Sequence, residues 1–446
     1  MKQFVTEEHQ KAAVHALEEL IQVPSVLDES DTGKGHPFGK KVVAALDKVV
    51  EICDQIGFKT FRDPDGYYAY AEVGEGKELF GILCHMDVVP AADQKGWETD
   101  PFKPEIKDGK IIGRGSQDDK GPSMAALFAV KALMDAGVTF NQRIRFIFGS
   151  DEENLWRCIE KYNEKEEGIT QGFAPDAEFP LIYAEKGLLQ AYLTGPGTNE
   201  VFVKAPGALN VVPDSAPYSG KHLAEVKKQL EAFGFDFEET ADGLAVLGKS
   251  IHAKDAPQGT NAISRLSMAL ANIVDFGPLN FLGKLVKENA TGENVVGKTV
   301  DEQSGELTMN IASLEITPEH TKIGIDMRIP VTFEKEDLVA KLSEKVKEYG
   351  LTYEEFDFLD SLYVPIESEL IQTLLGTYRE ITGDTSEPMI SGGATFARTM
   401  NNCVAFGAMF ADTPDFMHQA NEQWELASMY KVMTIYAEAI YRLCGK

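Results

Sequence analysis

The stretch Leu79-Phe80-Gly81-Ile82-Leu83-Cys84-His85-Met86-Asp87 places a short apolar run directly before a histidine and an aspartate. The run 79–84 is too short for a helix and is bounded by charge, which predicts a buried strand. His85 and Asp87 lie two residues apart, so in an extended chain both side chains leave the same face. A carboxylate in that place can hold the imidazole tautomer that a metal ion needs. Taken alone, a structural hydrogen bond is the commoner explanation of such a pair.

The segments around this strand alternate between helical and extended patterns. Residues 41–56 carry apolar residues at helical spacing and stop at Gly57, a residue type suited to a left-handed C-terminal cap. Pro122 fits the first turn of a helix that closes after Ala136, and residues 144–148 form a second buried strand. Strand, helix and strand in this order predict an α/β sheet covered by helices.

The middle of the chain follows a different pattern. Residues 322–329 alternate between apolar and polar side chains, and residues 308–316 do so less cleanly, which predicts antiparallel strands with one solvated face. Helical stripes at 223–233 and from Leu338 to Val346 complete a separate α+β unit of ordinary domain size. A helix from about residue 425 to 443 closes the chain. The 446 residues therefore exceed one domain, with a separate α+β unit in addition to the α/β unit.

Composition excludes several classes of protein. Hydrophobic residues make up 43% and charged residues 26%, which excludes wholesale disorder. The formal net charge of -28 repels phosphate backbones and anionic lipid, so we expect neither nucleic acid nor a membrane as a partner. The 5 cysteines are scattered, and no leader or membrane segment is visible, which together favour the cytoplasm.

Two further groups of acids follow predicted core elements. Asp118 and Asp119 lie in a glycine-rich loop before the helix, where capping and solvation suffice to explain Asp119. The acids Asp151-Glu152-Glu153 directly follow the second strand, where like charges repel unless they are solvated or bound to a cation. His85, Asp118 and Glu153 would all lie at the edge of the sheet where ligands gather.

Five motifs occur in order along the chain: His85-Met86-Asp87-Val88-Val89-Pro90, Gly113 through Gly121, Asp151-Glu152-Glu153, Pro175-Asp176-Ala177-Glu178 and Met417-His418. Together they resemble the M20 metallopeptidase family, and over essentially its full length the chain is most similar to bacterial dipeptidases of the PepV type. The resemblance implies an α/β catalytic domain with an inserted α+β lid domain, a di-metal aminopeptidase and carboxypeptidase-like architecture. The catalytic domain would comprise residues 1–186 and 364–446, and the lid, with its antiparallel sheet, residues 187–363.

The resemblance implies two divalent metal ions that share one ligand. His85, Asp118 and Asp176 would hold the first ion, and Asp118, Glu153 and His418 the second. The chemistry agrees, because two cations a few Å apart need a shared anion and open positions for water and substrate. Zinc is the expected metal, with manganese and cobalt as alternatives.

The resemblance also implies roles for residues that bind no metal. Glu152 would be the general base, with Asp87 supporting the His85 ring, and His252 would reach from the lid to the tetrahedral oxyanion. The substrate-binding residues would be Asn210, Arg328, Gly393 and Thr395. For Arg328, plain solvent exposure on the polar side of its strand is the simpler explanation; a role in binding a dipeptide carboxylate would suit its guanidinium.

The resemblance implies a metal-dependent dipeptidase that hydrolyses the peptide bond of dipeptides with a water that bridges the metal ions, and its large lid favours a monomer. An N-acyl amino acid deacylase of the same superfamily is the alternative, since only the group on the amine side differs. A third candidate is a catalytically silent binding protein with the same fold. It predicts a broken ligand set, whereas none of the family's ligands is missing here.

Overall fold

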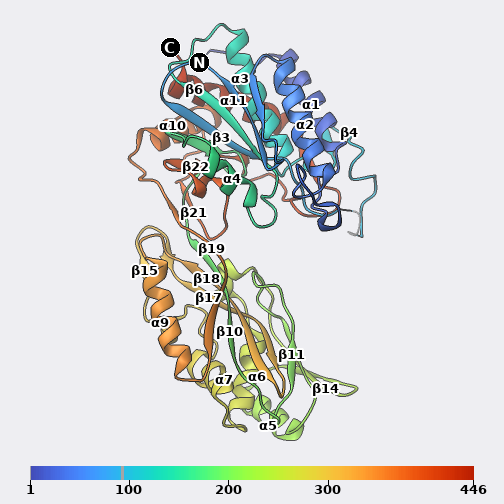
Figure 1. Ribbon diagram of the computed structural model, residues 1–446, viewed down its shortest axis with the longest axis vertical. Helices are drawn as coiled ribbons and strands as arrows, with labels where there is room; N and C mark the ends of the chain where they lie inside the picture. The colour runs from blue at the N-terminus through green and yellow to red at the C-terminus, as the bar shows by residue number, and fades with distance from the viewer. Residues whose placement is uncertain (1, 92–94) are drawn as a thin grey trace. The chain divides into compact units, whose positions relative to one another are not determined.

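The computed structural model describes residues 2–91 and 95–446, and the chain divides into two compact units (Figure 1). Unit 1 comprises Met1–Tyr183, Val364–Met389 and Thr395–Lys446. Unit 2 comprises Ala184–Tyr363 and the short later segment Ile390–Ala394. Each unit has its own sheet and its own helices, so each is described by itself.

The helices of unit 1 are α1 (Glu7–Ile21), α2 (Lys40–Gln55), α3 (Lys120–Asp135), α4 (Arg157–Lys165), α10 (Glu369–Thr382) and α11 (Leu426–Cys444). The strands that begin in unit 1 are β1 (Lys59–Arg62), β2 (Tyr68–Val73), β3 (Leu79–His85), β4 (Glu105–Lys107), β5 (Lys110–Ile112), β6 (Arg143–Gly149), β7 (Gln171–Ala174), β8 (Ala177–Glu178), β9 (Ile182–Glu185), β21 (Met389–Ser391), β22 (Cys403–Ala405), β23 (Ala408–Met409) and β24 (Gln423–Glu425).

A mixed sheet forms the centre of unit 1, with the strand order β1-β2-β6-β3-β7-β22-β9. Strand β3 runs parallel to both β6 and β7, and β7 runs parallel to β22. Every residue of β3 is buried, as expected for a central parallel strand that is covered on both faces. Helix α3 packs against α1 and α11, and α11 also packs against α10. The predicted α/β sheet covered by helices is therefore confirmed.

The ends of these helices follow from their sequences. Helix α2 closes near Gly57, whose φ of 96° lies in the left-handed region that favours glycine. Helix α3 begins at Lys120, two residues earlier than Pro122, so the proline lies in the first turn, where its missing N–H costs nothing. Within the described residues, no helix combines the length and the apolar character that a lipid bilayer would require.

The helices of unit 2 are α5 (Leu223–Phe233), α6 (Ala262–Ala271), α7 (Gly277–Asn280), α8 (Glu293–Val296) and α9 (Lys335–Lys347), with a 3-10 segment at Ala253–Gln258 and a π-helical turn at Phe281–Val286. Its strands are β10 (Gly187–Pro196), β11 (Val203–Ala205), β12 (Ser215–Tyr218), β13 (Phe237–Thr240), β14 (Gly243–Leu247), β15 (Val300–Asp301), β16 (Gly305–Glu306), β17 (Thr308–Ile316), β18 (His320–Ile329), β19 (Thr352–Leu359) and β20 (Leu362–Tyr363).

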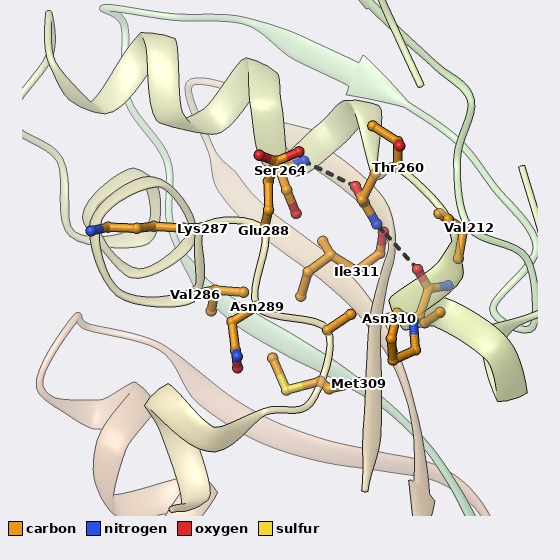
Figure 2. A pocket seen from close by; sticks show the side chains of 15 residues that line it. Val212, Thr260, Ser264, Val286, Lys287, Glu288, Asn289, Met309, Asn310 and Ile311 are labelled. Carbon is orange, nitrogen blue, oxygen red and sulfur yellow. Dashed lines mark hydrogen bonds between the residues drawn. The ribbon is translucent and has the colours of Figure 1, made fainter. Parts of the chain in front are cut away.

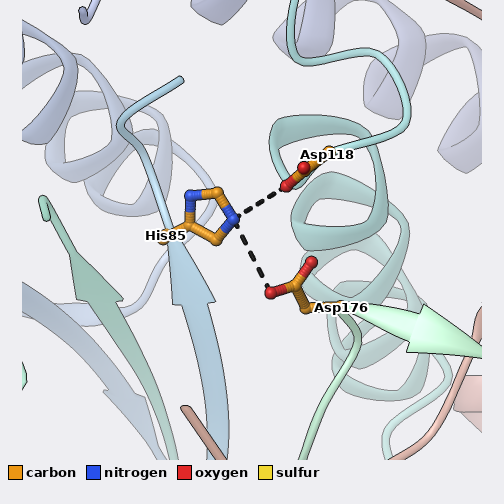
Figure 3. A group of neighbouring side chains, drawn as sticks. All are labelled: His85, Asp118 and Asp176. Carbon is orange, nitrogen blue, oxygen red and sulfur yellow. Dashed lines mark hydrogen bonds and ion pairs between the residues drawn. The ribbon is translucent and has the colours of Figure 1, made fainter. Parts of the chain in front are cut away.

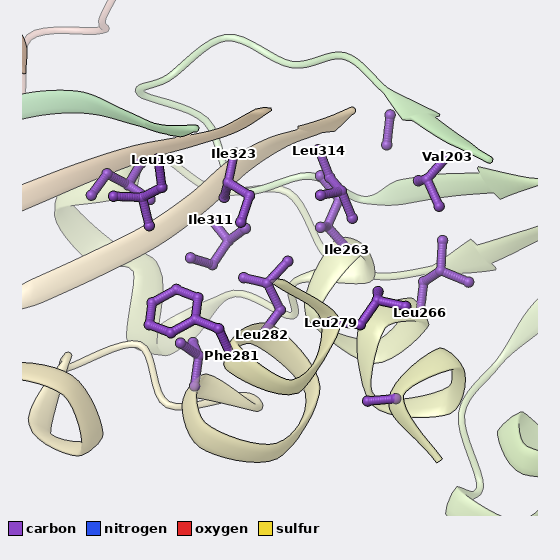
Figure 4. Close-up of a cluster of buried hydrophobic side chains, with 14 of the residues drawn as sticks. Leu193, Val203, Ile263, Leu266, Leu279, Phe281, Leu282, Ile311, Leu314 and Ile323 are labelled. Carbon is purple, nitrogen blue, oxygen red and sulfur yellow. The ribbon is translucent and has the colours of Figure 1, made fainter. Parts of the chain in front are cut away.

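An antiparallel sheet of order β11-β17-β18-β10-β19 forms the centre of unit 2. Its core face contributes Leu193, Ile311 and Ile323 to one hydrophobic cluster, which side chains of α6 and of the π-helical turn complete (Figure 4). The predicted antiparallel strands at 308–316 and 322–329 are thus confirmed as β17 and β18. Burial of this apolar surface is the main stabilising contribution to the unit.

The prediction that one face of residues 322–329 is solvated is wrong for the second half of β18. Asp326 is 0% exposed and Arg328 is 2% exposed. The Arg328 guanidinium donates to both carboxylate oxygens of Asp326, at 2.7 and 3.0 Å, and to the carbonyl oxygen of Gly392 at 2.8 Å. Paired in this way, the two charges are buried together, which strand alternation does not reveal.

Candidate metal centre

Three neighbouring parallel strands of unit 1 end at the same edge of its sheet. His85 is the last residue of β3 and lies opposite Gly149, the last residue of β6. Glu152 and Glu153 therefore follow within a few residues of that edge, and Asp176 follows just after β7. Because parallel strands end together, three segments that are separate in sequence bring a histidine and three carboxylates to one place.

Two loops bring the remaining side chains to this edge. Asp118 lies in the loop that leads into α3, and the peptide bond that joins it to Asp119 is cis. His418 lies in the loop between β23 and β24, with a positive φ of 59°. The His418 side chain is 55% exposed, whereas the His85 side chain is 1% exposed. One histidine is therefore held by a buried strand and the other by a surface loop.

Five side chains converge here as two trios that share Asp118. In the first trio, His85 Nε2 lies 2.9 Å from Asp118 Oδ1 and 3.7 Å from Asp176 Oδ2 (Figure 3). In the second, His418 Nε2 lies 2.9 Å from Asp118 Oδ2 and 3.1 Å from Glu153 Oε2. Each oxygen of Asp118 thus faces a different histidine, the arrangement expected of a carboxylate that bridges two cations.

The charges of these residues favour cations between them. Burial raises the pKa of Glu153 to about 7, and the negative charge of Asp118 acts in the same direction. The hydrogen bonds that the His418 ring donates to Asp118 and Glu153 raise its pKa to about 11. Buried carboxylates this close repel one another, and a divalent ion would offset that repulsion. With one imidazole and two carboxylates in each trio, the donor set fits divalent metal ions.

Asp87 orients both the histidine and the acids that follow β6. His85 Nδ1 lies 3.0 Å from the Asp87 carbonyl oxygen and 3.5 Å from its carboxylate, so Nε2 faces the trio. The Asp87 carboxylate accepts the backbone N–H groups of Glu152 and Glu153, each at 3.1 Å. The sequence pattern associates Asp87 with the His85 ring; in the structure the same carboxylate also holds the turn of the two glutamates.

Asp119 occupies the N-cap position of α3, as expected, but its side chain makes no cap hydrogen bond there, and the expectation that it is solvated is wrong. Asp119 is 0% exposed, and its Oδ2 accepts the backbone N–H of His85 at 3.1 Å and the Ser123 hydroxyl at 2.8 Å. Burial raises its pKa to about 7. The residue ties the loop of Asp118 to the end of β3, a contact between segments that are distant in the sequence.

The Glu152 carboxylate is near enough to His85, Glu153 and Asp118 for their charges to act on it, and it belongs to neither trio. Among the described residues it has no hydrogen-bond or ion-pair partner. Burial raises its pKa well above the usual value; His85 opposes this shift and the charge of Glu153 adds to it. A carboxylate that is unbonded and favours a proton is suited to proton transfer.

His252 and Asn210 lie together in unit 2. The backbone N–H of Ala253 donates to the Asn210 carbonyl oxygen at 2.8 Å. The backbone N–H of Lys254 donates to His252 Nδ1 at 3.1 Å, so in the neutral ring the proton is on Nε2. Burial lowers the pKa of His252, and the charges of Arg328 and Lys254 act in the same direction. His252 is therefore a neutral N–H donor.

The other residues predicted to bind substrate are divided between the units. Gly393 follows Gly392, the acceptor of the Arg328 hydrogen bond, within unit 2. Thr395 belongs to unit 1, where its hydroxyl accepts the backbone N–H of Ala397 at 3.3 Å. The buried pairing of Arg328 with Asp326 excludes the simple solvent-exposed reading of this arginine. Substrate binding by these residues stays a prediction.

A separate hollow lies in unit 2, next to the chain that follows His252 (Figure 2). Its walls include Pro257, Asn261 and Asn310, and Asn261 donates to Asn310 Oδ1 at 3.1 Å. The cavity measures about 50 Å³. That volume accommodates on the order of one or two water molecules. Its walls include none of the residues predicted to bind metal or substrate.

Gln117 and Glu422 are the two residues at the centre that the sequence analysis missed. Both are buried beside Asp118, at 2% and 0% exposed. Their contacts join residues about 300 positions apart, as between Gln117 and Pro414 or between Asp118 and Glu422. In the sequence, Gln117 lies within the Gly113–Gly121 motif and Glu422 lies four residues after His418, but neither residue belongs to a periodic pattern.

Comparisons with known proteins agree with this geometry. A model of the peptidase family M20/M25/M40 matches residues 81–442. A Staphylococcus haemolyticus protein named "Putative dipeptidase" is 35% identical over 463 residues, which cover 98% of each chain. The structure of the dipeptidase Dug1p from Saccharomyces cerevisiae is similar with a TM-score of 0.61 and 16% identity, covering 97% of this chain and 96% of that one. The Bacillus subtilis YXEP protein, described as a dinuclear metal binding peptidase, has a TM-score of 0.56 and 10% identity, covering 98% and 99%.

Proposed function

The chain belongs to the M20/M25/M40 peptidase family, and from that premise we propose that it is a dipeptidase dependent on two divalent metal ions. The relative that is 35% identical along 98% of both chains carries a dipeptidase name, which supports this substrate class. The observation that carries the metal dependence is Asp118, whose two oxygens lie 2.9 Å from two different histidines. When bound, the ions would polarise the scissile carbonyl and lower the pKa of a water molecule.

Unit 1 is the proposed catalytic domain and unit 2 the proposed lid. Glu152 takes a proton from the attacking water at its carboxylate and delivers it to the leaving amine nitrogen. His252 donates its Nε2–H to the oxyanion, because Nδ1 is already occupied by the Lys254 N–H. Asn210, Arg328, Gly393 and Thr395 are proposed to hold the dipeptide.

The finer assignments are proposals as well. Zinc is the proposed metal, because imidazole and carboxylate ligands suit it; manganese and cobalt accept the same donors. The proposed compartment is the cytoplasm, consistent with 5 cysteines that are all buried and an acidic charge of -28. A monomer is proposed, without nucleic acid or membrane as a partner.

A substrate panel tests the proposed function. Purified protein is incubated with free dipeptides and, separately, with N-acyl amino acids, before and after removal of metal by a chelator. We expect hydrolysis of dipeptides, its loss with the chelator, and its recovery when zinc, manganese or cobalt is restored. Cleavage of N-acyl amino acids alone would assign the chain to the deacylases, and activity that survives the chelator would contradict the metal dependence.

Replacing His252 by alanine tests the proposed oxyanion donor. We expect kcat for a dipeptide to fall by about 10²–10³-fold, because removal of one such donor has effects of that size. The KM should change little, since the hydrogen bond forms with charge that develops during the reaction. Steady-state kinetics give both constants. His320→Ala is the control in unit 2, because its side chain is 50% exposed. A raised KM with an unchanged kcat would instead make His252 a ground-state binding residue.

A further inference from the structure

A single buried glutamine connects the loops that carry Asp118 and His418. Gln117 Nε2 donates to the Pro414 carbonyl oxygen at 2.9 Å, and Gln117 Oε1 accepts the backbone N–H of Phe416 at 2.9 Å. Both ends of the amide are therefore used, and the side chain is 2% exposed. The residue directly before Asp118 thus binds the backbone of the other loop at two points, four and two residues before His418.

Glu422 strengthens the same connection from the other side of His418. Its carboxylate accepts the backbone N–H groups of Gly115 at 3.1 Å, Gln117 at 2.8 Å and Asp118 at 3.2 Å. It also pairs with Arg114 at 2.7 Å, and both of these charged side chains are 1% exposed. The backbone of the Asp118 loop is thus bonded to a residue four positions after His418.

The two trios depend on this connection to different degrees. His85 belongs to a fully buried strand whose ladder of hydrogen bonds holds it in place. His418 is 55% exposed and belongs to no helix or strand, so its loop is fixed by contacts such as those of Gln117. Loss of the Gln117 amide should therefore disturb the position of His418 more than that of His85.

We propose that Gln117 is a positioning residue that sets the affinity of the second trio for its metal ion, by fixing His418 relative to the shared ligand Asp118. Glu422 supports it by fixing the backbone of Asp118. The inference rests on the two-ion centre of the proposed function and is independent of the substrate. Groups that orient ligands in this way typically change metal affinity by about 10–100-fold.

The test is a calorimetric titration of metal-free protein with zinc, carried out on the wild type and on Gln117→Met. Methionine keeps a similar length and removes both hydrogen bonds. We expect the wild type to bind two equivalents, and the variant to keep the first while binding the second about 10–100-fold more weakly. The proposal would be overturned if the variant bound both zinc ions with wild-type affinity, or if its affinity for both ions fell equally.

Gln142→Met is the matched control. Gln142 is 6% exposed and donates to the Leu443 carbonyl oxygen at 3.1 Å, so it too connects distant parts of unit 1. Its loss should leave both zinc equivalents unchanged, which separates a positioning effect from a general loss of stability.

Gln117→Asn serves if the methionine variant does not fold, because it keeps a neutral amide but is one methylene too short to reach both Pro414 and Phe416. The second equivalent must again weaken, and two unchanged equivalents would overturn the proposal. The dipeptidase assignment fails separately, if wild-type protein binds two ions and cleaves no dipeptide. Wild-type protein that binds fewer than two ions would overturn the positioning role together with the centre.

Discussion

Replacing Glu152 by glutamine is expected to lower kcat for dipeptide hydrolysis by about 10²–10⁴-fold, the contribution typical of a positioned general base. Glutamine keeps the shape of the side chain and cannot accept the proton. Metal binding should persist, because Glu152 belongs to neither trio. The measurements are steady-state kinetics and metal analysis of the same preparation.

The neighbouring glutamate provides the matched comparison. Glu153→Gln removes a carboxylate whose Oε2 lies 3.1 Å from His418 Nε2, so this variant should lose affinity for the second ion. Adding metal in excess should then restore part of its activity, whereas Glu152→Gln should gain nothing. Recovery of Glu152→Gln with excess metal would show that Glu152 acts as a ligand, which would contradict its role as the base.

Replacing Asp118 by asparagine is expected to weaken the binding of both ions and to abolish turnover. Each oxygen of this carboxylate faces one trio, at 2.9 Å from His85 in one case and from His418 in the other. The amide nitrogen of asparagine is no metal ligand, so at least one trio loses a donor, and the lost charge weakens the attraction for both cations. Calorimetric titration with zinc measures both affinities.

Asp176→Asn is the control for Asp118→Asn. Asp176 contributes to the first trio only, through an oxygen 3.7 Å from His85 Nε2, so the second ion should still bind. If Asp118→Asn and Asp176→Asn gave the same titration curve, Asp118 would not be shared between the ions.

The local sequence was sufficient to predict those helices and strands whose structure depends on neighbouring residues. Residues 223–233 were expected to form a helix from their apolar spacing and the glycine that follows, and α5 has the same bounds. The run 79–84 was expected to be a buried strand, and β3 is buried along its length. The convergence of His85, Asp118 and Glu153 could be expected because strand ends and helix starts share one edge of an α/β sheet.

The sequence pattern could not predict which charged residues are buried, because their burial depends on partners far along the chain. Asp326 and Arg328 alternate as solvated residues do, yet the carbonyl oxygen of Gly392 completes their buried pairing. Asp119 had the position of a capping residue and proved to bond His85. Gln117 and Glu422 had no local signal beyond their places in the Gly113–Gly121 motif and four residues after His418, since their partners are separated from them by about 300 residues.

The hydrogen bonds between residues 114–118 and 414–422 join segments that are synthesised at different times. A chain still emerging from the ribosome carries His85, Asp118, Glu153 and Asp176 long before His418 and Glu422 have been translated. The second trio therefore cannot form on the nascent polypeptide. The first trio needs no residue beyond Asp176, so the two trios become available at different stages of synthesis.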